Sequence, residues 1–202
     1  MSPEQKEPIA TIDLDNVIFH GGPTFPTKNQ FLEKQQEIII HSLFFLRKFF
    51  DSLKPIIKEA PEGLKTLKDK GFLLVGLSGR PIELHPLTEK RLKREGLLKY
   101  FHSLFLNPTT QSSGEFKSHI IEHLIDNNYF VIHIEDDPEI AVKIAQINPQ
   151  KVCVFLVRNF GNHQAIINRA GLRLPKNVFR INNIGDAEDI ITTADFWQQT
   201  AQ

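Results

Sequence analysis

Two aspartates, Asp13 and Asp15, follow an apolar run of strand length that begins at Ile9. Residues two apart in an extended strand share a face, so both carboxylates should leave the strand on the same side. Two anions held that close repel each other, so they either share a proton or have a cation between them. Asp-x-Asp also occurs in ordinary turns, and the pair alone does not decide between a turn and a site.

Three further polar groups fall near the ends of later apolar runs. Ser78 and Gly79 follow the second predicted strand, and the acidic triplet Glu135–Asp137 follows the fourth. Lys117 stands at the start of the helix predicted to lead into that fourth strand. Each group has a structural explanation of its own: a turn, a solvated lysine or a helix start. Their joint placement at corresponding strand ends favours a functional site.

The residue types suit magnesium and phosphate. Mg²⁺ prefers oxygen ligands in octahedral geometry, which Asp13, Asp136 and the backbone carbonyl of Asp15 would supply. A hydroxyl, a backbone amide and a lysine charge suit phosphate oxygens. These phosphate groups would come from Ser78, Gly79 and Lys117.

The elements that must position these residues alternate regularly from residue 59 onward. Near-continuous apolar strands separated by helices predict an α/β fold, a three-layer doubly wound parallel sheet covered on both faces. Ligands of such sheets bind beyond the carboxyl ends of the strands. After the first strand, the sequence predicts strands at 72–77, 103–106, 129–134, 152–157 and 178–181, and helices at 61–70, 83–95, 117–126 and 138–147.

Residues 19–58 interrupt this alternation and predict a small helical insertion into a core formed by residues 1–18 and 59–202. A helix is expected over about 29–53, because the stretch has no Gly or Pro inside and apolar residues at helical spacing. Its apolar surface covers more than one face. Packing within the insertion is one explanation, and a dimer, partner or membrane-surface contact through residues 38–53 is the alternative.

Composition bounds the remaining possibilities. The 202 residues are 41% hydrophobic and carry 24 basic and 24 acidic side chains, so the formal net charge is zero. A neutral chain gives no general argument for a nucleic-acid partner or an anionic membrane. The single cysteine excludes a disulfide framework within the chain. With a polar N-terminus and no apolar run that could span a bilayer, a cytoplasmic protein is expected. Peripheral membrane attachment and export by another route stay open.

The ordered set Asp13-x-Asp15, Ser78, Lys117 and the acids around Asp136 resembles the haloacid dehalogenase (HAD) superfamily, specifically its phosphatase branch. The resemblance implies a HAD-like Rossmannoid fold in which Asp13 is the nucleophile that forms an aspartyl-phosphate. It implies that Asp15 is the general acid and then the general base. Ser78 and Lys117 would hold the phosphoryl group, and Mg²⁺ would neutralise its charge.

Further site residues follow from the same resemblance. Asp136 would be the principal acidic metal ligand, with Glu135 or Asp137 as the second, next to Asp13 and Asp15. Gly79 and Asn16 join the expected phosphate-binding residues, although many members have Gly where this chain has Asn16. An acid at position 15 favours phosphate-ester hydrolysis over carbon–halogen cleavage, because the leaving oxygen of an ester needs a proton.

The resulting functional prediction is a Mg²⁺-dependent phosphatase acting on a phosphorylated substrate. The resemblance implies that residues 19–58 form the small helical cap of the family, and a short cap implies an open site that would admit a large substrate such as a phosphotyrosine protein. A small-metabolite or nucleotide phosphatase is the alternative. An alternative of another class is a catalytically weak scaffold that binds a partner or membrane surface through the Phe-rich helix. A signalling receiver domain is disfavoured, because its lysine follows the last acidic motif whereas Lys117 precedes it.

Overall fold

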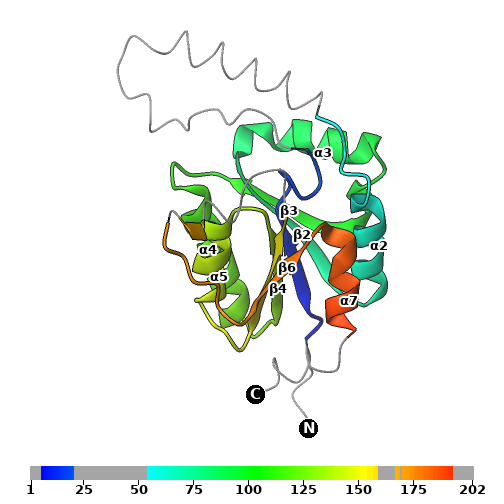
Figure 1. Ribbon diagram of the computed structural model, residues 1–202. Coiled ribbons are helices and arrows are strands. Elements are labelled where there is room, and N and C mark those ends of the chain that lie inside the picture. Colours follow the sequence, from blue (N-terminus) through cyan, green and yellow to red (C-terminus); the bar gives the residue numbers. More distant parts are fainter. Residues whose placement is uncertain (1–5, 21–53, 159–166, 169, 193–202) are drawn as a thin grey trace, which may run out of the picture.

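The computed structural model describes residues 6–20, 54–158, 167–168 and 170–192 (Figure 1). Its centre is a six-stranded sheet in the order β3-β2-β1-β4-β5-β6, with every neighbouring pair parallel. The predicted doubly wound α/β fold is therefore confirmed. The strands are β1 (Ile9–Ile12), β2 (Leu73–Pro81), β3 (Phe101–Asn107), β4 (Val131–Glu135), β5 (Val152–Val157) and β6 (Val178–Ile181).

Helices cover both faces of the sheet (Figure 1). On one face, α2 (Ala60–Asp69) and α7 (Ala187–Ile191) pack with Ala10 and Ile12 of β1 in one apolar cluster. On the other face, α4 (Ser113–Asp126) and α5 (Pro138–Ala145) enclose a second cluster with Val131 of β4 and alternate residues of β5. The described residues also form α3 (His85–Arg94) and the 3₁₀ turns η2 (Ile82–Leu84), η3 (Leu98–Tyr100) and η4 (Ile184–Asp186).

β1 lies at the centre of the sheet, and all four of its residues are buried. Ile12 pairs with Gly76 of β2 on one side and with Ile134 of β4 on the other. The strand order reverses between β1 and β4, since chain order runs outward from β1 in one direction and from β4 in the other. In open parallel sheets, such a reversal opens a crevice at the carboxyl ends of the two strands.

Several elements differ from the sequence prediction, and two of the differences affect the site. α4 begins at Ser113 rather than near Lys117, because Ser112 and Glu115 form a reciprocal capping box. Lys117 therefore lies in the second turn of the helix. β2 continues to Pro81, so the Ser78–Pro81 stretch belongs to the strand. The short α7 was not predicted. By contrast, α2 ends next to Gly71 at φ 85°, as the sequence predicted.

Both ends of the predicted insertion are described and lie side by side. The Ile57 amide donates to the Ile18 carbonyl, the His20 amide donates to the Pro55 carbonyl, each at 2.9 Å, and Phe19 forms a β-bridge with Ile56. The predicted helix at 29–53 and the predicted contact surface at 38–53 lie outside the described residues. Among the described residues, no helix is both long and apolar enough to cross a membrane.

Candidate active site

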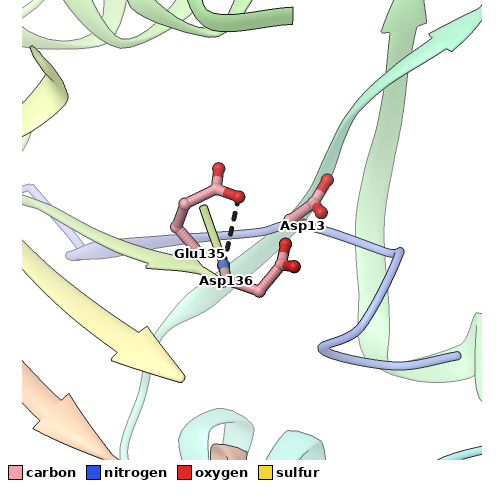
Figure 2. A group of neighbouring side chains, drawn as sticks. All are labelled: Asp13, Glu135 and Asp136. Carbon is pink, nitrogen blue, oxygen red and sulfur yellow. Dashed lines mark hydrogen bonds between the residues drawn. The ribbon is translucent and has the colours of Figure 1, made fainter. Parts of the chain in front are cut away.

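Three carboxylates meet at the carboxyl ends of the neighbouring strands β1 and β4. Asp13, Glu135 and Asp136 each offer an oxygen, and these oxygens all lie within 4.8 Å of one another. Figure 2 shows the three side chains gathered where the two strands end. The sheet hydrogen bonding reaches into the group, since the Asp13 amide donates to the Ile134 carbonyl at 2.9 Å. The parallel pairing of β1 and β4 thus brings together acids more than 120 residues apart in sequence.

Lys117 lies against this group from α4. Its Nζ is 2.9 Å from Asp13 Oδ1 and 2.7 Å from Glu135 Oε2, and the side chain is buried. Burial alone would lower the pKa of Lys117, but Asp13 and Glu135 raise it above its ordinary value. The ammonium is therefore charged at neutral pH, next to the expected nucleophile.

Glu135 is held at both carboxylate oxygens. Oε2 accepts from Lys117 Nζ and, at 3.0 Å, from His133 Nε2, while Oε1 accepts from the amides of Asp136 and Asp137 at 3.1 and 3.2 Å. Burial alone would raise the pKa of Glu135, but Lys117 and His133 bring it below its ordinary value. With four donors around it, Glu135 serves as the anchor of Lys117.

Asp13 and Asp136 are the two carboxylates of the group whose pKa values are raised. Burial raises the pKa of Asp13 to about 7 against the opposing effect of Lys117, and it raises that of Asp136 to about 8 with help from Asp13 and Glu135. Two acids with pKa values this far above their ordinary range would be stabilised as anions by a bound divalent cation. A hard cation with oxygen ligands, Mg²⁺ above all, therefore fits this donor set.

Asp15 faces a different environment. Arg80 binds both of its oxygens, with Nε 2.8 Å from Oδ2 and Nη2 2.6 Å from Oδ1, and Lys54 Nζ lies 2.9 Å from Oδ1. Burial would raise the pKa of Asp15, but Arg80 and then Lys54 lower it well below its ordinary value. Asp15 is therefore ionised in this arrangement, and its side chain stands outside the three-carboxylate group.

Arg80 is itself fixed from several sides. It is 3% exposed, its Nη1 lies 3.4 Å from Thr88 Oγ1, and its guanidinium carbon is 5.4 Å from the centre of the Phe19 ring. Sequence reasoning gave Arg80 no role, although an arginine near the end of an apolar strand was a usable signal. Sequence reasoning also missed Lys54, Thr11 and His133. His133 lies within the apolar run 131–134, two residues before Glu135 and so on the same face of the strand.

The remaining predicted residues are placed as follows. Asp137 Oδ1 accepts from the amides of Glu139 and Ile140 and caps α5, so the structure does not bring Asp137 into the carboxylate group. Asn16 has a left-handed backbone, φ 59°, and its Nδ2 donates to Asp136 Oδ2 at 2.8 Å. The side chain thus orients an acid of the group, and the left-handed backbone accounts for the glycine common at this position.

Ser78 and Gly79 lie at the carboxyl end of β2, next to β1. Ser78 is buried, and its Oγ accepts from the Arg80 amide at 3.4 Å. Gly79 faces the first residue of α4, Ser113, with no room for a Cβ. Phosphate binding by Ser78, Gly79 and Asn16 stays a prediction.

The sequence and the structure of this chain were compared with those of known proteins. No protein-family model matches the sequence, and no curated protein matches it. Solved structures do match. A haloacid dehalogenase-like family hydrolase from Streptococcus pneumoniae has TM-score 0.63 and 11% identity, covering 92% of this chain and 99% of its own. A predicted phosphoglycolate phosphatase from Haemophilus somnus has TM-score 0.62 and 10% identity, covering 94% and 100%. A predicted phosphatase from Clostridium acetobutylicum has TM-score 0.63 and 17% identity, covering 92% and 98%. The chain therefore has the fold of the haloacid dehalogenase-like hydrolases.

Proposed function

We propose that this protein is a Mg²⁺-dependent phosphomonoester hydrolase in which Asp13 takes up the phosphoryl group. The observation that carries the proposal is the surroundings of Asp13: a buried carboxylate 2.9 Å from the Lys117 ammonium and within 4.8 Å of Asp136. Structural neighbours described as phosphatases support it. Mg²⁺, held by Asp13 and Asp136, would neutralise charge on the phosphoryl oxygens.

Two steps account for the reaction. A carboxylate oxygen of Asp13 attacks phosphorus as the ester P–O bond breaks, and the leaving oxygen takes a proton from Asp15. Water then attacks the phosphorus of the aspartyl-phosphate and loses its proton to Asp15. The bond between phosphorus and the Asp13 oxygen breaks, which releases inorganic phosphate and restores the carboxylate.

Other residues of the chain support these steps. Lys117 provides a fixed positive charge beside Asp13, where negative charge on the phosphoryl oxygens develops. Asp15, ionised between Arg80 and Lys54, is in the state that accepts the proton of the attacking water. Before it donates to a leaving group, its carboxylate must take up a proton and leave one of the Arg80 hydrogen bonds.

The test is phosphate release by purified protein with and without Mg²⁺, on a panel of p-nitrophenyl phosphate, phosphotyrosine peptides, nucleotides and sugar phosphates. We expect Mg²⁺-dependent turnover in the wild type and a loss of at least about a thousandfold in Asp13→Asn. Asp126→Asn, an exposed acid at the end of α4, serves as the matched control and should keep full activity. Acid quenching during turnover should trap phosphate on Asp13.

Full turnover in folded Asp13→Asn would contradict the nucleophile assignment. A wild type inactive across the whole panel would contradict the hydrolase proposal and favour the scaffold alternative. The panel also decides between the large and the small substrate, because the prediction of an open site depends on residues 19–58, of which 21–53 lie outside the described residues.

A further inference from the structure

A buried ladder of polar side chains runs from the carboxylate group down into the sheet. Thr11 of β1 and Asp13, which directly follows that strand, are two residues apart, and so are His133 and Glu135 of β4. Each pair therefore points to one face of the sheet. Thr11 pairs in register with His133, so the two strands place these four side chains next to each other. Thr11 and His133 are 0% exposed. The other residues of β4, which are Val131, Ile132 and Ile134, belong to the two apolar clusters.

The hydrogen bonds of the ladder follow one order. Thr11 Oγ1 lies 2.9 Å from His133 Nδ1, His133 Nε2 lies 3.0 Å from Glu135 Oε2, and the same Oε2 accepts from Lys117. Lys117 in turn lies against Asp13. The expected nucleophile is thus connected to the sheet interior by a continuous chain of contacts.

The tautomer of His133 follows from its neighbours. The Glu135 carboxylate accepts only, so His133 Nε2 must carry a proton. Burial lowers the pKa of His133, which favours the neutral ring. In a neutral ring with its proton on Nε2, Nδ1 is the acceptor. The Thr11 hydroxyl supplies the donor at 2.9 Å, in preference to the Ile132 carbonyl at 3.3 Å. Every polar atom of the buried imidazole is then satisfied.

An imidazole at this position is not needed by the sheet. A buried polar ring costs free energy unless it is hydrogen-bonded, and an apolar side chain would serve the strand equally well. What His133 adds is a donor at Glu135 Oε2, the oxygen that binds Lys117. The backbone amides of Asp136 and Asp137 hold only the other oxygen. Within the part of the chain that the structure describes, the side chains that restrain Oε2 are those of His133 and Lys117.

We propose that His133, seated on Thr11, is a positioning residue that fixes Glu135 Oε2 and thereby aims the Lys117 ammonium at Asp13 and the transferring phosphoryl group. This inference rests on the proposed hydrolase function. His133 touches neither the substrate nor the cation in this role. It acts through Glu135, as partners of catalytic and metal-binding side chains commonly do.

The test compares three variants of the full chain. His133→Leu removes the donor, His133→Gln returns an N–H donor at similar reach, and Thr11→Val removes the hydroxyl with little change in volume. Asn177→Ala serves as the control, because it removes hydrogen bonds to the Ala145 and Val152 carbonyls at the opposite ends of the strands. Each variant is measured for kcat and KM on the best substrate of the panel, for Mg²⁺ affinity, and for the ¹⁵N resonances of the Lys117 ammonium and the imidazole.

We expect His133→Leu to lower kcat about 10- to 100-fold with Mg²⁺ affinity unchanged, and to shift the Lys117 resonance. His133→Gln should recover most of the loss, and Thr11→Val should show a smaller loss of kcat. Asn177→Ala should change stability without changing kcat. Wild-type ring nitrogens should show the proton on Nε2.

Several results would overturn the inference. One is a folded His133→Leu with wild-type kcat, and another is His133→Gln as impaired as His133→Leu. If His133→Leu does not fold, the inference is also overturned when Thr11→Val has an unchanged kcat and the His133 ring of the wild type carries its proton on Nδ1. If the wild type hydrolyses nothing, the hydrolase proposal fails separately. The Lys117 resonance then decides, since an unchanged resonance in His133→Leu or Thr11→Val rejects the positioning role.

Discussion

The Arg80 guanidinium binds both carboxylate oxygens of Asp15, at 2.8 and 2.6 Å. This contact exists because β2 does not end at Ser78 but continues to Pro81, which carries Arg80 to the residue that follows β1 by three positions. A two-point contact fixes the carboxylate in rotation as well as in position. The proposed proton-transfer residue is thus oriented by a side chain 65 residues away in sequence.

Replacing Arg80 should therefore affect Asp15 directly. We expect Arg80→Ala to raise the pKa of Asp15 and to lower the free energy of unfolding by about 2 kcal/mol, because two hydrogen bonds to a charged group are lost. Arg80→Lys keeps the charge without the fork and should show a smaller change. Carboxyl ¹³C NMR and urea unfolding measure the two effects. Arg94→Ala, which removes an exposed pair with Glu95, is the control, and equal effects in both alanine variants would contradict the assignment.

The adjacent acids Asp136 and Asp137 should differ in metal binding. Asp136→Asn removes a charge from the carboxylate group and should abolish Mg²⁺ binding in calorimetric titration. Asp137→Asn should leave Mg²⁺ affinity unchanged, because Asn is as good a helix cap as Asp and keeps the bonds to the start of α5. The reverse result would show that Asp137 is the ligand.

Metal-free protein should lose stability as pH rises. The pKa values of Asp13 and Asp136, about 7 and about 8, lie above the ordinary value of 3.8, so the native state binds more protons than the unfolded state between these limits. The free energy of unfolding should fall over this range by up to about 1.4 kcal/mol per pH unit for each proton. Urea unfolding in the presence of a chelator measures it.

Two controls accompany this pH series. Saturating Mg²⁺ should remove most of the decline, since a cation stabilises the ionised carboxylates, and Asp136→Asn should make the metal-free curve flatter. A free energy of unfolding that rises between pH 4 and pH 8 in chelator would mean that these two acids are not protonated in the folded state.

Gly79 should tolerate no side chain. A Cβ at this position would lie 2.5 Å from the Ser113 Cβ and 3.1 Å from its Cα, in the first turn of α4. We expect Gly79→Ala to lower the free energy of unfolding by about 1–3 kcal/mol through overpacking. Ser113→Gly should recover part of the loss in the double variant, whereas Ser113→Ala, which keeps the Cβ, should recover less. Additive losses in the double variant would exclude this contact as the cause.

The fold was predictable because most of its strands are apolar runs that are easily recognised in the sequence. β5 and β6 have the predicted bounds: β5 is an apolar run, β6 is apolar except for Arg180, and polar residues flank both. The start of α4 was missed because the prediction followed the apolar pattern and overlooked the Ser112–Glu115 capping box, which is legible in the sequence. α7 is too short to give a helical period.

The candidate site was predictable only in part. Asp13, Lys117 and Asp136 could be grouped because parallel topology brings strand ends together regardless of their separation in sequence. Separate roles could not be assigned to the three consecutive acids at 135–137. The direction in which each side chain points depends on the residue at which β4 ends and the residue at which α5 begins. The pairing of Asp15 with Arg80 depends on how far β2 extends. The register between β2 and β3 shifts between Ser78 and Pro81, and the sequence pattern does not reveal that β2 continues past this shift.

The central position of β1 has a consequence for synthesis on the ribosome. β1, which leads directly into the proposed nucleophile Asp13, is synthesised before the other five strands of the sheet, yet its partner β4 emerges some 120 residues later, as the contact of Thr11 with Ile132 shows. Until then, one edge of an apolar strand lacks its partner, a condition that slows folding and invites aggregation. The acidic centre is therefore assembled only when translation has passed Asp136, so truncated nascent chains should be inert.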